Sequence, residues 1–275
     1  MPASKKAALV SARPRLGDVK ANLQRVLDAA RAVEADLIAF PELFLSGYAM
    51  RDELRQMAAD LHAMDAAGQI RDAARATGKT LVTGLPRPGE IRGTLHNSAL
   101  IATPDGRVGY HDKVYLPNFS CFEEELFFKE GQQARVFDTP VGRVGLTICY
   151  DLFFPEITKA QALQGADLLL CVSASPTPSR RAFETLFAAR AVECTSYLLY
   201  TNLVGLQDTL TFWGAPQAYG PRGDLKGKAD TLEEATLIVD LDLSEVEEAR
   251  QRRPVLRDTR PEVLRKLLQA GEGSP

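Results

Sequence analysis

The sequence predicts an α/β fold with mixed sheets, and three observations support this. Short apolar runs of strand length, such as 37–40, alternate with segments of helical periodicity, such as 18–35. Two pairs of strand-like segments flank turn sequences, at 104–106 and 140–142. Hairpins and βα units in one chain favour mixed over purely parallel sheets, and a sandwich of two sheets with helices outside fits this pattern.

Each expected helix has its own signal. In 18–35 the apolar residues fall on one helical face: Val19, Leu23, Val26, Leu27 and Ala30. The segment 51–77 is mostly helical and should break near 65–68, and a proline in the first turn marks a helix at 155–164. Two more helices are expected at 179–196 and 244–252.

The expected strands are short apolar or alternating runs bounded by proline, glycine or aspartate. They span residues 7–10, 37–40, 80–84, 95–101, 107–110, 135–138, 143–148, 168–172, 198–202, 217–219 and 237–240. Because no repeat or linker interrupts them, we expect one domain over 1–275, with 250–275 as a C-terminal tail.

Composition excludes several classes of function. A formal net charge of -3 with scattered Lys and Arg gives no electrostatic footprint for nucleic acid. The longest apolar run, at 168–172, is far shorter than the ~20 residues of a membrane span. Residues 1–10 lack the apolar core and cleavage site of a signal peptide, so we expect a cytoplasmic protein.

The cysteines and histidines argue against a metal centre. The four cysteines form no CxxC pair, and the three histidines have no metal-ligand spacing. We therefore expect free thiols and neither a metal ion nor another cofactor.

Three segments place a reactive side chain after an apolar strand. They carry Glu42, Lys113 and Cys149. A thiol attacks as its thiolate, so it needs a nearby base and a positive charge to stabilise the developing negative charge. Taken singly, the residues have plainer interpretations: a buried small hydrophobe for Cys149, a helix N-terminal residue for Glu42 and a solvated Lys113.

The motifs around these residues, taken together, resemble the carbon–nitrogen hydrolase (nitrilase) superfamily. They are Phe-Pro-Glu-Leu at 40–43, Asp-Lys-Val-Tyr-Leu-Pro-Asn at 112–118 and Ile-Cys-Tyr-Asp-Leu-Phe-Phe-Pro-Glu at 148–156. The resemblance covers nearly the whole chain and implies a four-layer α-β-β-α sandwich with two mixed sheets. It also implies a Glu-Lys-Cys triad, which corresponds to Glu42, Lys113 and Cys149.

The resemblance further implies a second active-site glutamate between the lysine and the cysteine. Glu123, Glu124 and Glu125 are consecutive there, and we favour Glu124, with Glu123 as the main rival. Residues expected to contact substrate are Tyr150, through its backbone N–H, with Tyr48, Ser173, Ser175 and Glu123.

The implied reaction is acyl transfer through a thioester on Cys149, with release of ammonia. Nitrilases proper tend to carry Cys-Trp-Glu, whereas this chain has Cys149, Tyr150 and Asp151, so we expect a small amide or carbamoyl substrate. The alternatives are a nitrilase acting on a small nitrile, an acyltransferase, and a non-catalytic binding protein on the same fold.

Some features leave specificity and assembly open. The sequence departs from the family's usual pattern at His96 and Pro216, and Trp213 is either a surface aromatic or a pocket wall. Arg181 and Arg190 are candidates for holding a substrate carboxylate. The resemblance implies a homodimer or a higher homo-oligomer, to which the apolar residues of 254–268 would contribute.

Overall fold

A computed structural model describes residues 4–272 of the chain. The predicted domain and tail also include 1–3 and 273–275, which lie outside the described residues.

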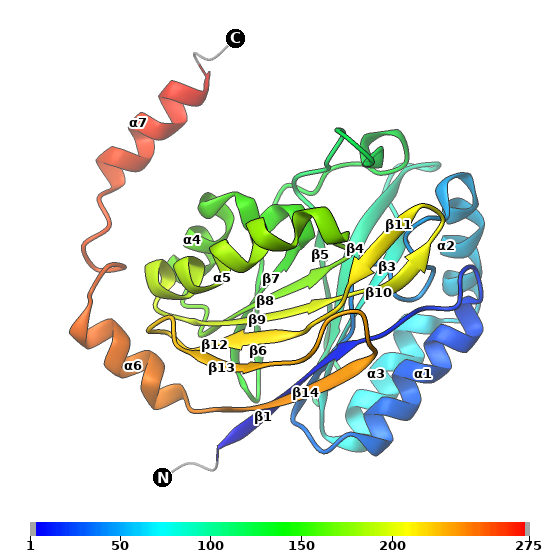
Figure 1. Cartoon of the computed structure of the whole chain (residues 1–275), viewed down its shortest axis with the longest axis horizontal. Helices are drawn as coiled ribbons and strands as arrows, with labels where there is room; N and C mark the ends of the chain where they lie inside the picture. Colours follow the sequence, from blue (N-terminus) through cyan, green and yellow to red (C-terminus); the bar gives the residue numbers. More distant parts are fainter. Residues whose placement is uncertain (1–3, 273–275) are drawn as a thin grey trace.

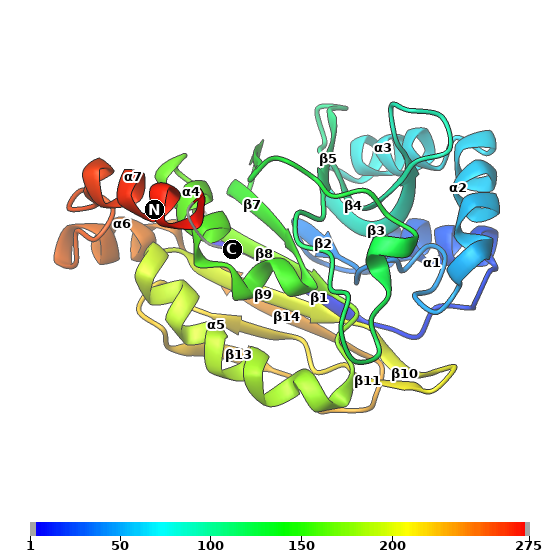
Figure 2. The same ribbon diagram turned by 90° about the horizontal axis from the view of Figure 1, so that it is seen from above.

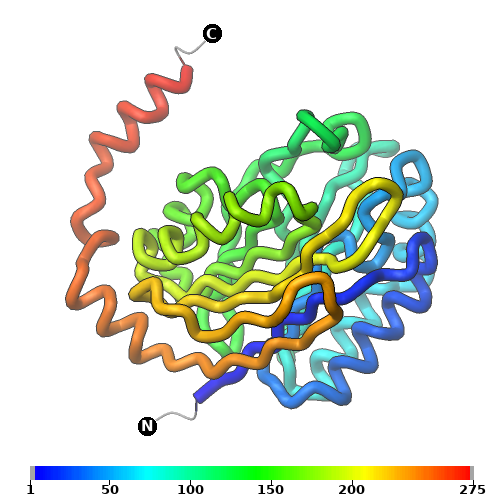
Figure 3. Tube along the Cα trace, in the orientation of Figure 1, coloured from blue at the N-terminus to red at the C-terminus, as the bar shows by residue number. Residues whose placement is uncertain are grey.

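The first sheet has six strands with a parallel centre and antiparallel edges. Its order is β14 (Ala235–Leu241), β1 (Lys5–Ser11), β2 (Leu37–Ala39), β3 (Thr80–Pro88), β4 (Leu95–Ala102) and β5 (Val108–Asp112). Strands β1, β2 and β3 run parallel, and every other pair is antiparallel. Strands β1 and β14, from opposite ends of the chain, lie side by side (Figure 3).

The second sheet repeats this plan. Its order is β13 (Leu225–Lys228), β12 (Gln217–Tyr219), β9 (Tyr197–Asn202), β8 (Leu168–Ser173), β7 (Gly142–Ile148) and β6 (Val136–Thr139). Here β7, β8 and β9 are parallel, and the outer pairs are antiparallel. The prediction of two mixed sheets is therefore confirmed.

Helices cover the outer face of each sheet, as Figures 1 and 2 show. On the first sheet these are α1 (Val19–Ala32), α2 (Leu54–Ala63) and α3 (Ala66–Thr77); on the second they are α4 (Pro155–Leu163) and α5 (Arg180–Cys194). The sheets face each other through strands such as β1 and β9, which gives the predicted α-β-β-α layers.

Strand β1 shows why the sequences of the central strands are continuously apolar. Its alternate residues Ala7 and Leu9 join the core between the sheets, whereas Ala8 and Val10 join the core beneath the helices. Because successive side chains point to opposite faces and both faces are covered, every position is apolar.

Several elements differ from the sequence prediction. The break in 51–77 falls at 64–65, where Asp65 adopts a left-handed φ of 50° and its side chain caps α3 through the N–H of Gly68. The hairpin of β10 (Val204–Gln207) and β11 (Leu210–Trp213), strand β13 and α7 (Pro261–Glu272) were not predicted. Helix α6 (Leu243–Arg252) was predicted. None of the helices described is long and apolar enough to span a membrane.

Four short 3₁₀ turns complete the structure in the described part of the chain. They are η1 (Arg51–Glu53), η2 (Glu124–Leu126), η3 (Cys149–Phe153) and η4 (Thr177–Ser179). Three of them lie beside the site described next.

Candidate active site

Glu42 lies in the protein interior, in the turn that follows β2. The strand ends at Ala39, and Leu43, one residue after the glutamate, adopts a left-handed φ of 48°. Gly84 of β3 lies against this turn, where an added Cβ would come within 2.2 Å of the Leu43 nitrogen. A glycine is therefore required for the close approach, and it leaves Glu42 fully buried.

Lys113 follows β5 directly and is held by its own backbone. Its N–H donates to the carbonyl of Asn97 at 2.8 Å, and its carbonyl accepts from the N–H of Gly131 at 2.7 Å. Its side chain is fully buried, so the solvated interpretation of Lys113 is wrong.

Cys149 directly follows β7 and is the first residue of η3. Its φ is 48°, a left-handed value that is uncommon for any residue other than glycine. Strained backbone of this kind concentrates at functional sites. Cys149 is only 4% exposed.

The buried charges form one cluster around the Lys113 ammonium. Nζ lies 2.8 Å from Oε1 of Glu42 and 2.7 Å from Oε1 of Glu124. The amide of Asn97 donates to Oε1 of Glu42 at 2.6 Å, and the Tyr48 hydroxyl donates to Oε1 of Glu124 at 2.7 Å. A buried charge is tolerated when it is paired and hydrogen-bonded in this way.

The other oxygen of Glu42 reaches the second sheet. Its Oε2 accepts a hydrogen bond of 2.6 Å from the backbone N–H of Ala174, the residue after β8. The glutamate thus fixes the two sheets relative to each other at the site.

The electrostatics keep the cysteine protonated at rest. Burial and the charge on Glu42 raise the pKa of Cys149 well above its usual value, against the opposing effect of Lys113. Burial by itself would lower the pKa of Lys113, but the charges on Glu124 and Glu42 outweigh it and raise that pKa. The cluster therefore contains a neutral thiol beside a permanent ammonium.

The pKa of Glu124 is also displaced upward. Burial raises it to about 7, against the lowering effect of Lys113, and the charge on Glu42 adds to the rise. Two carboxylates that share one ammonium repel each other, so the second is the harder to ionise.

Asp151 connects the lysine segment to the cysteine turn. Its fully buried carboxylate accepts from the backbone N–H groups of Val114 at 3.0 Å and Tyr115 at 2.9 Å through Oδ1. Through Oδ2 it accepts from Ile148 N–H at 3.0 Å and bonds to Nε2 of His111 at 3.1 Å. One side chain therefore joins the ends of β5 and β7.

The three consecutive glutamates separate by burial. Glu124 is 4% exposed and faces Lys113. The side chain of Glu123 is 53% exposed, and that of Glu125 accepts from the exposed Asn118 amide. The geometry thus brings Glu124, not Glu123, into the charged cluster, while its catalytic role stays a prediction.

The other predicted substrate contacts fall in different places. Tyr48 reaches Glu124, and Ser173 is buried at the end of β8, where its hydroxyl partly offsets the raised pKa of Cys149. The aromatic ring of Tyr150 packs against Phe119, Phe153 and Phe154.

Ser175 and Trp213 form a supporting network. The indole N–H of Trp213 donates to the Ser175 hydroxyl at 3.3 Å, and the ring stacks on Tyr200. Trp213 is 1% exposed, so its interpretation as a surface aromatic is wrong. Substrate contact by Ser175 stays a prediction.

Sequence reasoning missed the supporting roles of four residues, Asn97, His111, Asp151 and Arg190. Asn97 binds Glu42, Asp151 bonds to His111 as described, and the largely buried Arg190 donates to the carbonyls of 152 and 153. Arg190 thus braces the turn after Cys149. Its suggested role in holding a substrate carboxylate stays a prediction. The signal for Asn97 was available: a lone amide in the apolar run of β4 needs a buried partner.

A cavity of about 190 Å³ opens beside the charged cluster. Tyr48 and Glu124 form its inner wall, and Leu54, Phe127, Phe128 and Leu210 supply apolar sides. Arg51, Glu123 and Asp208 also line it, and they are solvent-exposed.

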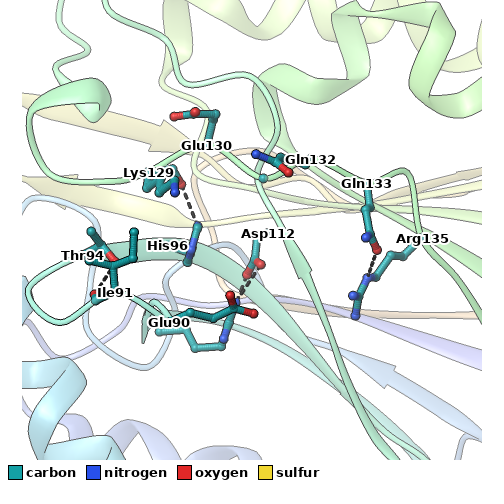
Figure 4. Close-up of a pocket in the computed structure, with 12 residues that line it drawn as sticks. Glu90, Ile91, Thr94, His96, Asp112, Lys129, Glu130, Gln132, Gln133 and Arg135 are labelled. Atoms are coloured by element: carbon teal, nitrogen blue, oxygen red, sulfur yellow. Dashed lines mark hydrogen bonds and ion pairs between the residues drawn. The ribbon is translucent and has the colours of Figure 1, made fainter.

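A second cavity, of about 230 Å³, is shown in Figure 4. Its polar groups bond to one another: Arg87 to Asp112 at 2.7 Å, His96 to the Lys129 carbonyl at 2.7 Å, and Arg135 to Gln133 at 2.8 Å. None of the cluster residues lines it. Of these two cavities, only the one at Glu124 is lined by a residue of the charged cluster.

No group of three or more His, Cys, Asp or Glu within residues 4–272 is arranged to hold a metal ion.

The sequence of this chain matches the model of a known protein family. The family model described as "Carbon-nitrogen hydrolase" matches residues 6–251. The chain belongs to the carbon–nitrogen hydrolase family. The predicted family is confirmed, and the protein is an enzyme of the class that hydrolyses carbon–nitrogen bonds.

Its relatives are diverse. A glutamine-dependent NAD(+) synthetase of Aquifex aeolicus is 32% identical over 86% of this chain, which spans only 42% of that protein's length. An (R)-stereoselective amidase of Pseudomonas sp. is 31% identical over 97% of this chain and 93% of its own.

A solved amidase structure has the same overall fold. A mutant of the amidase from Nesterenkonia sp. AN1, with the acetamide moiety of fluoroacetamide added covalently at the active site cysteine, superposes with a TM-score of 0.82. It is 32% identical and covers 95% of this chain and 96% of its own. The carbon–nitrogen hydrolase described here thus shares its fold with a solved amidase.

Proposed function

We propose that this enzyme hydrolyses a small amide, or a carbamoyl compound, through a thioester on Cys149 with release of ammonia. One observation carries the proposal. An ammonium has three N–H donors, and Lys113 uses two of them, on Glu42 and Glu124, in hydrogen bonds among residues 4–272. The third is free for an oxyanion formed beside Cys149.

The first half of the reaction forms the thioester. Glu42 takes the thiol proton as the sulfur bonds to the amide carbon, so no free thiolate is needed at rest. Lys113 and the Tyr150 backbone N–H stabilise the oxyanion. The tetrahedral intermediate then breaks its C–N bond, and the leaving nitrogen takes the proton from Glu42 and departs as ammonia.

The second half of the reaction hydrolyses the thioester and regenerates the free enzyme. Water attacks the thioester carbon and gives one proton to Glu42, with Glu124 beside the same ammonium to orient it. The second tetrahedral intermediate breaks its C–S bond. The acid is released, and the proton on Glu42 returns to the Cys149 sulfur.

Relatives named amidases support an amide substrate, whereas two others are named a probable nitrilase and a nitrilase, so nitriles belong in the same assay. One relative is named an (R)-stereoselective amidase, and a mutant of the Nesterenkonia amidase carries the acetamide moiety of fluoroacetamide covalently at its active site cysteine. Ammonia release from a panel of small primary amides, carbamoyl compounds and nitriles tests the proposal. Turnover of nitriles alone would favour a nitrilase, and turnover of nothing would favour a binding protein.

Variants assign the roles. Because losing one oxyanion donor costs about 10²–10³ in rate, Lys113→Ala should lower kcat by that factor while far-UV circular dichroism stays unchanged. Cys149→Ala should abolish turnover, and rapid acid quenching followed by intact-protein mass spectrometry should detect the acyl adduct only when Cys149 is present. Full activity of Cys149→Ala would refute the assignment.

A further inference from the structure

One buried glutamine of the β10–β11 hairpin, yellow in Figure 1, holds the segment that carries Tyr48. Gln207 is the last residue of β10 and is 1% exposed. Its Oε1 accepts a hydrogen bond from the backbone N–H of Tyr48 at 2.9 Å and another from that of Ala49 at 3.3 Å. One side chain thus joins the hairpin to the segment between β2 and η1, 159 positions earlier in the chain.

The amide of Gln207 works here only as an acceptor. Two backbone N–H groups point at one atom of the amide, so that atom is its oxygen. The Nε2 atom is buried and has no hydrogen-bond partner among the residues that the structure describes. A buried donor without a partner lowers stability. What this position gains from a glutamine is therefore the acceptor oxygen that holds residues 48 and 49.

The segment that Gln207 holds has little freedom at Tyr48. Gly47 has a left-handed φ of 88°, and a Cβ added there would lie 3.6 Å from Oε1 of Gln207. The N–H of Gly47 donates to the carbonyl of Leu43 at 2.8 Å. The ring of Tyr48 packs edge-on against Phe212 of β11, with 5.7 Å between the ring centroids. The hairpin therefore contacts both the backbone and the ring of Tyr48.

The hydroxyl of Tyr48 extends this contact into the charged cluster. It donates to Oε1 of Glu124 at 2.7 Å, the same oxygen that accepts from Nζ of Lys113 at 2.7 Å. The other charged group that acts on Glu124 is Glu42, and Glu124 in turn acts on the thiol of Cys149. Burial raises the pKa of Glu124 to about 7, and the Tyr48 hydrogen bond opposes that rise because it favours the charged form.

We propose that Gln207 is a positioning residue for catalysis, which holds the backbone of Tyr48 so that the Tyr48 hydroxyl stays on Glu124 and keeps it ionised. The proposal rests on the proposed function, in which Glu124 orients the water that attacks the thioester. The hairpin, whose residues 208–210 also line the cavity beside Glu124, thereby supports the second half of the reaction.

Loss of this support should change the proton affinity of Glu124. Without Gln207, the N–H groups of Tyr48 and Ala49 lose their acceptor, and the segment must shift to find another. A shift of about 1 Å is enough to break the 2.7 Å bond to Glu124. Because a hydrogen bond to a charged group is lost, the pKa of Glu124 should rise by about one unit.

The pH dependence of ammonia release tests this inference, with the best substrate of the panel of small amides and carbamoyl compounds. Gln207→Met removes both polar atoms of the amide and keeps the length of the side chain. We expect the fall of kcat at low pH to move up by about one pH unit. The variant should then have about one tenth of the wild-type kcat at pH 6 and nearly the wild-type kcat at pH 9. A purely structural role would lower kcat by the same factor at every pH.

A double-mutant cycle tests whether Gln207 acts through Tyr48. Tyr48→Phe removes the hydroxyl and should move the pH dependence of kcat by about the same amount. Gln207→Met should then add no further shift in the Tyr48→Phe background. Gln217→Met is the matched control, because Gln217 on β12 is also buried and its amide pairs with Glu184 and Tyr219, outside the charged cluster. It should leave the pH dependence of kcat unchanged.

A second measurement does not depend on turnover. The free energy of unfolding in urea should fall as Glu124 ionises, and in Gln207→Met and Tyr48→Phe this fall should extend about one pH unit higher than in the wild type. If Gln207→Met does not fold, Gln207→Ala replaces it and has the same expected result.

The outcomes separate this inference from the proposed function. An unchanged pH dependence of unfolding, a loss of kcat that is equal at every pH, or shifts that add in the double variant would overturn the role of Gln207 and leave amide hydrolysis intact. If no amide is turned over, the proposed reaction fails, and the unfolding measurement still decides whether Gln207 acts on Glu124 through Tyr48.

Discussion

The carboxylate of Asp151 is the support on which the alignment of Lys113 and Cys149 depends, and Asp151→Asn removes its charge with little change in shape. If Oδ1 keeps its bonds to the N–H groups of Val114 and Tyr115, the new Nδ2 faces the N–H of Ile148, which loses its acceptor. His111 can still bond by accepting through Nε2, because its Nδ1 has no partner among the described residues.

The magnitude follows from these four bonds. An unsatisfied buried N–H costs about 1–3 kcal/mol, and two charge-assisted bonds that become neutral lose about 1 kcal/mol each. Relief from burying a charge offsets part of this, so we expect a net loss of about 3 kcal/mol. For a domain of this size, that loss lowers Tm by about 6–12 °C.

The effect on catalysis should exceed the effect on stability. Relaxation at this point shifts the β5 end relative to the Cys149 turn, and a misplacement of about 1 Å costs about 10² in rate. Well below Tm, ammonia release should therefore show kcat reduced about 100-fold with KM nearly unchanged. Alkylation of Cys149 by chloroacetamide, an amide-like probe, should slow in parallel.

Asp138→Asn is the matched control for this experiment. It removes the same charge from a side chain that is 67% exposed on β6 and pairs with Arg143. It should change neither kcat nor Tm measurably. If Asp151→Asn retains kcat and the alkylation rate within twofold, or if it changes KM alone, the positioning argument is refuted.

Three further predictions concern the cluster and the C-terminal helix. Burial raises the pKa of Glu124 in the folded state from 4.5 to about 7, so the folded state binds this proton more tightly than the unfolded state does. The free energy of unfolding should therefore fall by up to about 3 kcal/mol as pH rises from about 4.5 to 7. Urea unfolding should show this fall in the wild type and not in Glu124→Gln, and equal pH dependence in both proteins would contradict the reasoning. Because the pKa of Cys149 is raised well above its usual value, thiolate absorbance at about 240 nm should be the same at pH 8 in the wild type and in Cys149→Ala, and a larger signal in the wild type would count against it. Helix α7 exposes Val263, Leu264, Leu267 and Leu268, so we expect it to pack on a second copy of the chain, and light scattering should show Leu264→Glu/Leu268→Glu dissociating to a monomer; a wild-type monomer would remove the prediction.

Local signals determined much of this protein. Both faces of the central strands are buried, so runs such as 37–40 and 168–172 are apolar throughout and visible without a structure. The cysteine turn and the glutamate turn were also visible, because their motifs are contiguous in sequence. The hairpin β10–β11 was not visible, since each of its strands has only four residues and shows no regular alternation of buried and exposed positions.

The contacts within the charged cluster could not be predicted from the sequence. Glu42, Lys113 and Cys149 follow three different strands, and their order along the chain indicated shared chemistry without any distance. Choosing Glu124 over Glu123 needed burial, because neighbouring glutamates have the same intrinsic chemistry and differ only in which way the backbone turns them. Asp151 and His111 looked unremarkable until two sheets brought them within 3.1 Å.

The sequence by itself therefore determined the layered α/β fold, the family and the three residues expected to react. Each depends on local chemistry: period, turn residues and contiguous motifs. Only the tertiary structure decided which groups meet, namely the ammonium shared by two glutamates, the carboxylate that joins β5 to β7, and the amide of Gln207 that holds the Tyr48 segment. Those contacts join residues tens of positions apart, and hydrogen bonds and Coulomb forces act over a few ångströms of space regardless of distance along the chain.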